Sequence, residues 1–108
     1  MWSTLPIIPH YKLVLCYDIR RGMHRTYHRY VISEFVPALN DMEIYVVEAW
    51  YTAYGQYPIR QVEYVANSID TLQRAFDTER WDDLETRLKA FTTSYSRKII
   101  PYRRGFQF

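Results

Sequence analysis

The alternation of apolar and polar residues divides the chain into strand patterns and helix patterns. The longest strand pattern runs from Ile44 to Tyr54, a stretch rich in β-branched and aromatic residues that holds no Gly or Pro. Successive residues of a strand point to opposite sides of a sheet, and neither side of this strand is polar. We therefore predict a central strand in a sheet that is covered on both faces. A chain of 108 residues can hardly provide both covers alone, so a partner is implied.

The residues around this strand continue the pattern on both sides. Apolar residues alternate over 11–19, which predicts a first strand with one apolar face and one mixed face. After a turn at 20–22, apolar residues recur at helical spacing from Met23 to about Asn40, which predicts an amphipathic helix laid on the sheet. A turn directly after Tyr54 predicts that 59–66 returns as an antiparallel hairpin partner.

The last third of the chain predicts a second helical region and a final strand. Asn67-Ser68 and Asp77-Thr78 are typical helix caps, and the apolar stripe that follows the second pair continues to Tyr95. We expect the last strand from about Lys98 to Phe106, and Pro101 favours a sheet edge or a bulge. The element order is therefore strand, helix, strand, strand, helix, strand. It predicts an α+β, ferredoxin-like βαββαβ fold, with a four-stranded antiparallel sheet and both helices on one face.

We expect one domain over 1–108, with residues 1–10 as an extended arm because of Pro6 and Pro9. The bare face of the sheet should meet its twin in a second chain, which predicts a homodimer formed through the sheet face. No run is long and apolar enough for a membrane span and the start does not look like a signal peptide, so we expect a cytoplasmic protein without a membrane partner.

From Tyr11 to Phe106 the chain resembles the dimeric α/β-barrel superfamily, on the strength of its element order, its length and its long aromatic second strand. Within that superfamily it is similar to antibiotic-biosynthesis monooxygenases, stress-responsive barrel proteins and NIPSNAP-like proteins. The resemblance implies a barrel closed by two sheets, with ligands between the sheet and the helices of each protomer. It implies no single activity, because the superfamily contains cofactor-free oxygenases, haem-degrading enzymes, isomerases and proteins without known activity.

The long strand supplies the candidate catalytic residue. Glu48 interrupts an apolar face beside Val46 and Trp50, and a carboxylate buried there would have a raised pKa and could accept a proton from a ligand. The alternative is a structural ion pair with Arg60 or Arg103. Glu63, on the neighbouring strand, is expected to be exposed.

Aromatic residues supply the candidate ligand site. Aromatic walls with a few polar groups are typical of sites for flat hydrophobic molecules, although residues at such spacing also serve as core. The candidates are Trp50, Tyr17, Tyr54 and Tyr64, with Trp81 facing them from the second helical region. These residues predict binding of a small hydrophobic or aromatic molecule, and the family resemblance implies monooxygenase-like oxidation without a cofactor as the reaction. The alternative is a structural or regulatory dimer without catalysis.

Three other features of the sequence are weaker candidates for a chemical role. His24 and His28 are four residues apart on the first helix, but two imidazoles are too few for a metal site and none is expected. Cys16 is the single cysteine and is interpreted as a packed, inert thiol. Residues 91–108 carry four basic residues and no acid, which we interpret as solvated surface.

An RNA-recognition domain has the same element order, which makes RNA binding an alternative function. Such domains carry a basic and aromatic signature on their third strand. Here a superficial echo of it, Arg104-Gly105-Phe106-Gln107-Phe108, falls on the last strand, and 60–66 does not match. We therefore do not expect RNA binding or a nucleic-acid partner.

Overall fold

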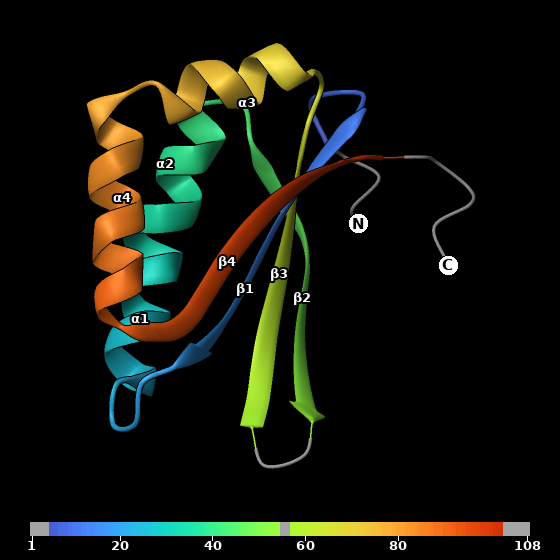
Figure 1. Cartoon of the computed structure of the whole chain (residues 1–108). Helices are drawn as coiled ribbons and strands as arrows, with labels where there is room; N and C mark the ends of the chain where they lie inside the picture. The colour runs from blue at the N-terminus through green and yellow to red at the C-terminus, as the bar shows by residue number, and fades with distance from the viewer. Residues whose placement is uncertain (1–4, 55–56, 103–108) are drawn as a thin grey trace.

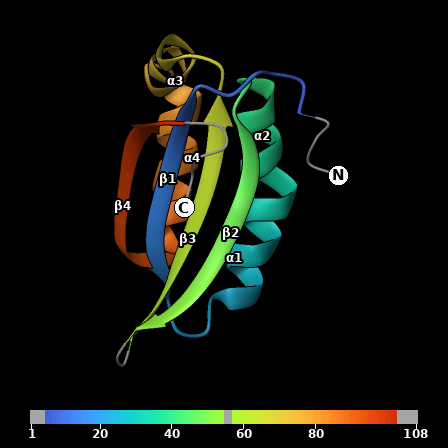
Figure 2. The same cartoon turned by 90° about the vertical axis from the view of Figure 1, so that its right-hand side faces the viewer.

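A computed structural model of the protein describes residues 5–54 and 57–102, and over 48–54 and 57–59 it describes the backbone alone. Its strands are β1 (Tyr11–Ile19), β2 (Tyr45–Tyr54), β3 (Tyr57–Ala66) and β4 (Thr92–Pro101). Its helices are α1 (His24–Tyr30), the π-helical η2 (Val31–Phe35), α2 (Val36–Asp41), α3 (Ile69–Phe76) and α4 (Glu79–Ala90). Figure 1 shows the helices on one side of the sheet, and Figure 2 looks onto the other side.

The strands pair in the order β2-β3-β1-β4, and every neighbouring pair is antiparallel. This topology confirms the ferredoxin-like fold. The prediction that Ile44 to Tyr54 is a central strand was wrong, because β2 lies at an edge and β1 and β3 occupy the middle. The reason is the helical crossover after β1, which carries the chain past one strand position and leaves room for β3 to return between β1 and β2.

The predicted first helix is present as three consecutive segments over 24–41. Pro37 stands at the start of α2, directly after η2. Because proline has no amide hydrogen and its ring clashes with the preceding turn, a regular α-helical ladder cannot continue through it. A π-helical turn is a common way to absorb such a defect. The wide turn sets the position of Phe35, the fully buried side chain of η2.

Both predicted helix caps are observed, but the last strand begins earlier than predicted. The Thr71 amide donates to Ser68 Oγ at 3.2 Å, and the Trp81 amide donates to Thr78 Oγ1 at 3.1 Å. β4 starts at Thr92 rather than near Lys98, so Tyr95 belongs to a strand and not to a helical stripe. The Thr- and Ser-rich run after α4 has low helix propensity, and its pairing with β1 decides in favour of a strand. Residues 103–106 of the predicted strand lie outside the described part of the chain.

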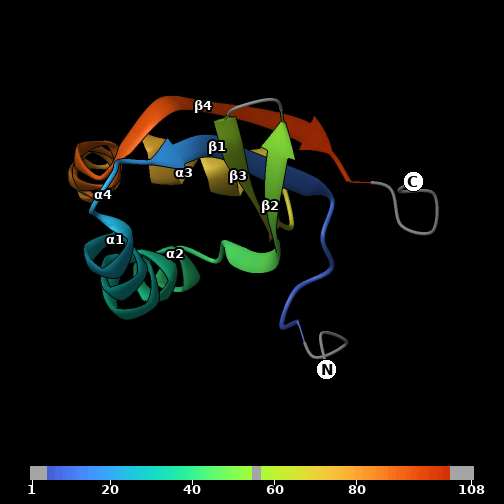
Figure 3. The same ribbon diagram turned by 90° about the horizontal axis from the view of Figure 1, so that it is seen from below.

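The core fills the space between the sheet and the helices. Figure 3 looks along this space from below and shows the helices beside the twisted sheet. The sheet contributes side chains from the apolar faces of β1 and β3, and the helices contribute their buried stripes. The largest side chains that are fully buried here are Trp81, Tyr17, Tyr64, Phe35, Leu13, Leu15, Leu39, Ile44, Leu72 and Leu88.

The side of the sheet away from the helices carries an ion pair that is also withdrawn from water. Lys12 Nζ lies 2.9 Å from Glu63 Oε1, and the two residues are only 8% and 6% exposed. Gln61 Nε2 donates to the other carboxylate oxygen of Glu63 at 2.8 Å, and the Cys16 thiol donates to Gln61 Oε1 at 3.6 Å. The expectation that Glu63 is exposed was therefore wrong. Alternation alone predicts its face but not the neighbours that shield it.

None of the helices in the part of the chain that the structure describes has both the length and the apolar content needed to cross a bilayer.

The burial of this ion pair predicts an unequal response to removing one carboxylate. Glu63→Gln should lower the free energy of unfolding by about 3 kcal/mol, because the substitution removes a buried carboxylate that pairs with Lys12 and accepts from Gln61. Asp41→Asn is the matched control, since Asp41 pairs with Arg80 at 3.2 Å on an exposed surface and should cost far less. Urea unfolding of both variants at one protein concentration measures the difference, and equal costs would contradict the prediction.

Candidate functional site

A pair of buried tyrosine hydroxyls lies between the sheet and the first helix. Tyr17 on β1 and Tyr27 on α1 are 1% and 4% exposed, and their hydroxyl oxygens are 2.6 Å apart. Their rings meet edge to face, with centroids 5.7 Å apart. Only one of the two hydroxyl hydrogens is used in this bond. The pair therefore keeps one donor that a further acceptor can use.

Two more donors close by have no acceptor among the described residues. The Tyr64 hydroxyl on β3 and Trp81 Nε1 on α4 are buried without a hydrogen-bond partner, and both residues are 1% exposed. The Phe35 ring lies beside both residues. Its centroid is 6.1 Å from the centroid of the Tyr64 ring and 6.1 Å from that of the Trp81 ring. Because a buried donor without a partner costs about 1–3 kcal/mol, such groups in a folded protein call for an explanation. A bound acceptor would provide one.

The buried phenols act as donors and not as bases. Burial raises the pKa of Tyr17 and of Tyr64 far above that of a free tyrosine, and the neighbouring phenol Tyr27 raises both further. Burial also raises the pKa of Tyr30 to about 12. These side chains therefore stay protonated at neutral pH. Protonated phenols held in a dry interior suit a ligand that accepts hydrogen bonds, such as a carbonyl or an oxyanion.

Two side chains from the sheet border the tyrosine pair. The Tyr95 ring on β4 stacks on the Tyr17 ring, with centroids 6.2 Å apart and planes 10° apart, and its hydroxyl donates to Glu85 Oε2 at 2.7 Å. Arg60 on β3 is registered opposite Tyr17, and its guanidinium lies over the Tyr27 ring, 5.5 Å from the centroid. A fixed positive charge therefore stands beside the hydroxyl pair, where it favours an anionic or carbonyl ligand.

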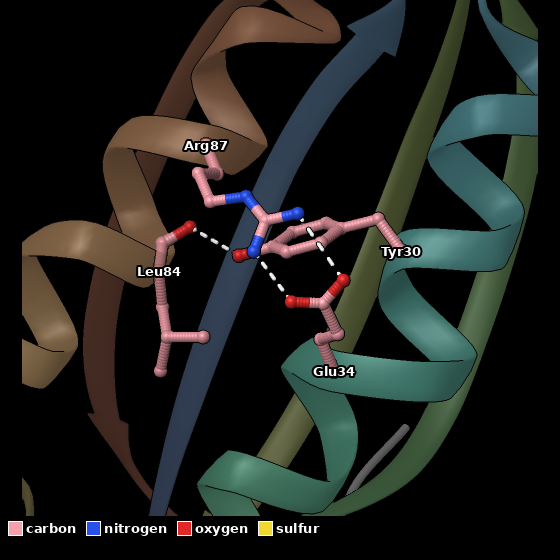
Figure 4. Close-up of polar contacts among 4 residues, drawn as sticks. All are labelled: Tyr30, Glu34, Leu84 and Arg87. Carbon is pink, nitrogen blue, oxygen red and sulfur yellow. Dashed lines mark hydrogen bonds and ion pairs between the residues drawn. The ribbon is translucent and has the colours of Figure 1, made fainter.

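A clamp ties the helices over this region together (Figure 4). The Tyr30 hydroxyl donates to the Leu84 carbonyl at 2.7 Å, and the Arg87 guanidinium lies over the Tyr30 ring, 4.6 Å from its centroid. Arg87 also donates two hydrogen bonds to Glu34, one of them at 3.1 Å, and this hydrogen bonding lowers the pKa of Glu34. The clamp joins η2 to α4 and so positions Phe35 against Trp81.

Comparison with known proteins gives likenesses of structure only. No family model matches the chain, and no curated protein matches it. A NIPSNAP family protein of unknown function from Agrobacterium tumefaciens superposes with a TM-score of 0.64 at 15% identity, over 90% of this chain and 91% of that one. A dimeric ferredoxin-like protein from an uncultured marine organism superposes with a TM-score of 0.60 at 12% identity, over 94% of each chain. SnoaB, a cofactor-independent oxygenase from Streptomyces nogalater, has a TM-score of 0.59 at 12% identity, over 92% of this chain and 98% of its own. The chain has the ferredoxin-like fold of these structures. The likenesses confirm the resemblance inferred from the sequence, and at these identities they extend to the fold alone.

Of the residues that the sequence predicts to line the site, the structure brings Tyr17 and Tyr64 into one buried cluster with Trp81. The other three, Glu48, Trp50 and Tyr54, lie on β2 where the backbone alone is described. In the ladder Glu48 is registered opposite Glu63, and a register shift separates it from Val46. The alternative partner Arg103 lies outside the described residues.

The weaker candidates are apart from this cluster. His24 and His28 are both exposed. In the described ranges, 5–54 and 57–102, no three His, Cys, Asp or Glu side chains gather in a way that could hold a metal ion. Cys16 is half-buried and engaged with Gln61.

Sequence reasoning missed the roles of Tyr27, Phe35 and Arg60 in this site. Tyr27 and Phe35 belong to the apolar stripe of the predicted first helix, which marks them as core but not as neighbours of Tyr17 or Trp81. A shared face predicts that side chains turn inward. It does not say which inward side chains of different elements meet.

The raised pKa values predict that alkaline conditions destabilise the fold. Because the folded state holds these phenol protons more tightly than the unfolded chain, the contribution is complete below about pH 10 and is lost as the pH rises above it. We expect buried tyrosines to ionise only together with unfolding, near or above pH 12. Tyrosinate absorbance and circular dichroism recorded along one titration test this, and ionisation of all eleven tyrosines near pH 10 with a native spectrum would contradict it.

Proposed function

We propose that the chain is a homodimeric barrel protein that binds a small aromatic molecule carrying oxygen, between its sheet and its helices. The observation that carries the proposal is the pair of buried donors without acceptors among the described residues, the Tyr64 hydroxyl and Trp81 Nε1, whose rings both lie beside the Phe35 ring. An acceptor on the ligand would satisfy these donors, and the surrounding rings would contact its flat apolar body.

The charge of the site favours a particular ligand class. Protonated phenols and the Arg60 guanidinium all favour electron-rich oxygen, as in a quinone carbonyl, an enolate or a phenolate. A plain hydrocarbon would leave the donors unsatisfied. The proposed ligand is therefore a hydroxylated or carbonyl-bearing aromatic compound.

The proposed reaction is a monooxygenase-like oxidation without a cofactor. Glu48, the proton acceptor proposed from the sequence, is registered opposite Glu63, a ladder position that belongs to the helix-free face, so its catalytic role has to be tested separately from the buried phenols. The structural likeness to SnoaB, described as a cofactor-independent oxygenase, supports this choice of chemistry. Removal of a proton would leave negative charge on the ligand oxygen, and the buried phenols are donors suited to stabilising it. The alternative is a structural or regulatory dimer in which the donors stay unsatisfied.

The homodimer is proposed to form through the helix-free face of the sheet. At the centre of this face Lys12 and Glu63 neutralise each other, and their apolar neighbours Val14 and Val65 are already buried within the single chain, so a second sheet would meet the half-buried residues beside them, such as Cys16 and Gln61. A neutralised, largely apolar strip suits contact with a second sheet. The likeness to a dimeric ferredoxin-like protein supports the same assembly.

We predict that native mass spectrometry will find a dimer and that Cys16→Glu will shift it to monomer. Cys16 alternates with the core residues Leu15 and Tyr17, so it faces away from the helices, and it is half-buried in the single chain. A charge there would be desolvated by a second sheet. Ile32→Glu is the matched control, because Ile32 is 59% exposed on the helix layer. A monomer from the unchanged chain, or a Cys16→Glu dimer of equal affinity, would contradict the prediction.

We predict that juglone, a hydroxynaphthoquinone, binds about tenfold to a hundredfold more tightly than naphthalene, because only juglone can accept hydrogen bonds from the buried donors. Tyr64→Phe should remove about tenfold of the affinity for juglone while leaving the ligand-free fold as stable or more so. Tyr95→Phe is the matched control, since its hydroxyl is already engaged with Glu85. Titration calorimetry measures all of these affinities.

The same proteins separate binding from catalysis. Oxygen uptake with juglone in its reduced form tests the reaction, and Glu48→Gln tests whether that carboxylate takes part. Lower turnover at an unchanged dimer mass would assign Glu48 a catalytic role. If Glu48→Gln lowers only stability, the carboxylate is structural. If juglone and naphthalene bind equally, or neither binds, the proposed site is wrong and the alternative of a non-catalytic dimer is favoured.

A further inference from the structure

One end of the molecule carries a concentration of positive charge that the proposed ligand site does not use. The turn after β1 and the start of α1 contain four arginines and two histidines within 20–29, with no acidic residue between them. All six side chains are exposed: Arg20, Arg21, His24, Arg25, His28 and Arg29. We call this surface the basic end. The net charge of the whole chain is only +2, so the charge is local.

The described part of the chain supplies no counter-charge to these arginines. Among the described residues, no carboxylate forms an ion pair with any arginine of the basic end. Three arginines elsewhere in the described chain are paired: Arg80 with Asp41, Arg87 with Glu34 and Arg97 with Glu85. Glu34, which follows Arg29 on the same helical run, is already engaged by Arg87. The positive charge of the basic end therefore remains available to an outside anion.

The position of these charges is not explained by helix stability. Because the helical run continues from α1 to α2, His24 and Arg25 stand in the first turn of a longer helix, where the helix dipole disfavours cations. The opposite arrangement is found on α3 and α4, whose first turns carry the acids Asp70, Glu79 and Asp82. The acidic residues of α3 and α4 stand where the helix dipole favours them, and the cations at the start of α1 stand where it does not.

The fold extends the basic end across two elements. The Arg20 amide donates to the Phe91 carbonyl at 2.9 Å, which holds the end of α4 beside the turn after β1. Figures 1 and 3 both show the start of α1 next to the end of α4. Lys89, exposed in the last turn of α4, adds a further positive charge at this end. The result is a surface patch and not a linear run of charge.

From this patch we infer that the basic end binds the phosphate backbone of nucleic acid without reading its sequence. Guanidinium groups match phosphate oxygens in geometry and charge, and four of the six side chains are arginines. The tyrosines of α1, Tyr27 and Tyr30, are buried, so no described aromatic ring of α1 is free to stack on bases. Binding of this kind uses a surface other than the sheet, and it does not depend on the proposed small-molecule site.

A membrane surface is the weaker fit for the same charge. A helix that lies on a bilayer inserts an apolar face, but the apolar side chains of this helical run, among them Tyr30, Phe35 and Leu39, are packed in the core. On its exposed side the run carries one large apolar residue, Ile32. Charge alone would then have to hold the protein on lipid, so anionic vesicles serve as an arm of the test.

The test is fluorescence anisotropy of a labelled duplex of about 20 base pairs, as DNA and as RNA, titrated with the full chain over a range of salt. Four arginines on phosphates predict a slope of about −4 for log K against log salt, and equal affinity for duplexes of scrambled sequence. The variant Arg21→Gln, Arg25→Gln, Arg29→Gln should bring the slope to about −1 and lower the affinity at least tenfold at low salt. Circular dichroism checks that the exposed substitutions leave the fold intact.

Arg74→Gln is the matched control, because Arg74 is exposed on α3 and forms no ion pair with a described residue. It should leave both the slope and the affinity unchanged. Three outcomes would overturn the inference: no binding of either duplex, an equal loss of binding in the control, or binding to phosphatidylserine vesicles without binding to duplex. None of these outcomes bears on the juglone titration, so the two proposals fail or stand separately.

Discussion

The packing of large tyrosine and tryptophan rings between one sheet and one helix layer is the constraint on which the rest of the structure depends. Each ring supplies a large apolar area, and each also brings a polar atom that must find a partner inside the core. The hydroxyls of Tyr17 and Tyr27 form a hydrogen bond with each other, and the Tyr30 hydroxyl donates to the Leu84 carbonyl. The Tyr64 hydroxyl and Trp81 Nε1 have no hydrogen-bond partner among the described residues. The same packing that stabilises the fold thus leaves donors in the interior, and these define the candidate site.

Charge in this molecule is arranged in three ways that have different consequences. The Lys12 and Glu63 pair is buried, so each partner depends on the other for its stability in the fold. The Glu34 and Arg87 clamp is about half exposed, and its main contribution is to hold the π-helical turn against α4. The arginines of the basic end have no acidic partner among the described residues. The first arrangement concerns folding, the second concerns the geometry of the site, and the third concerns partners.

The two proposed activities occupy different parts of the fold. The small-molecule site lies between layers, where water is excluded and hydrogen bonds are selective. The basic end lies on the surface, where salt screens charge and contacts with a polyanion are many and weak. A dimer formed through the helix-free face would leave the helix layer of each chain exposed. Both surfaces would then be present twice in the assembly.

The sequence predicts the element order, the fold class, the helix caps and which faces turn inward, because these follow from local propensity and from periods of two or of three to four residues. It therefore placed Tyr17, Tyr64 and Trp81 in the interior correctly. It could not determine that β2 lies at the edge, that β4 begins at Thr92, or that Glu63 is buried, because each depends on which strand lies beside which.

The chemistry of the candidate site depends on contacts between side chains of different elements, which the sequence does not reveal. The contact of Tyr17 with Tyr27 spans two elements, and Phe35 reaches both Tyr64 and Trp81 across three. Whether a buried hydroxyl is satisfied depends on atoms brought together from distant parts of the chain, and no spacing in the sequence records that meeting. The sequence determines how many donors enter the core, and the packing decides which of them are left for a ligand.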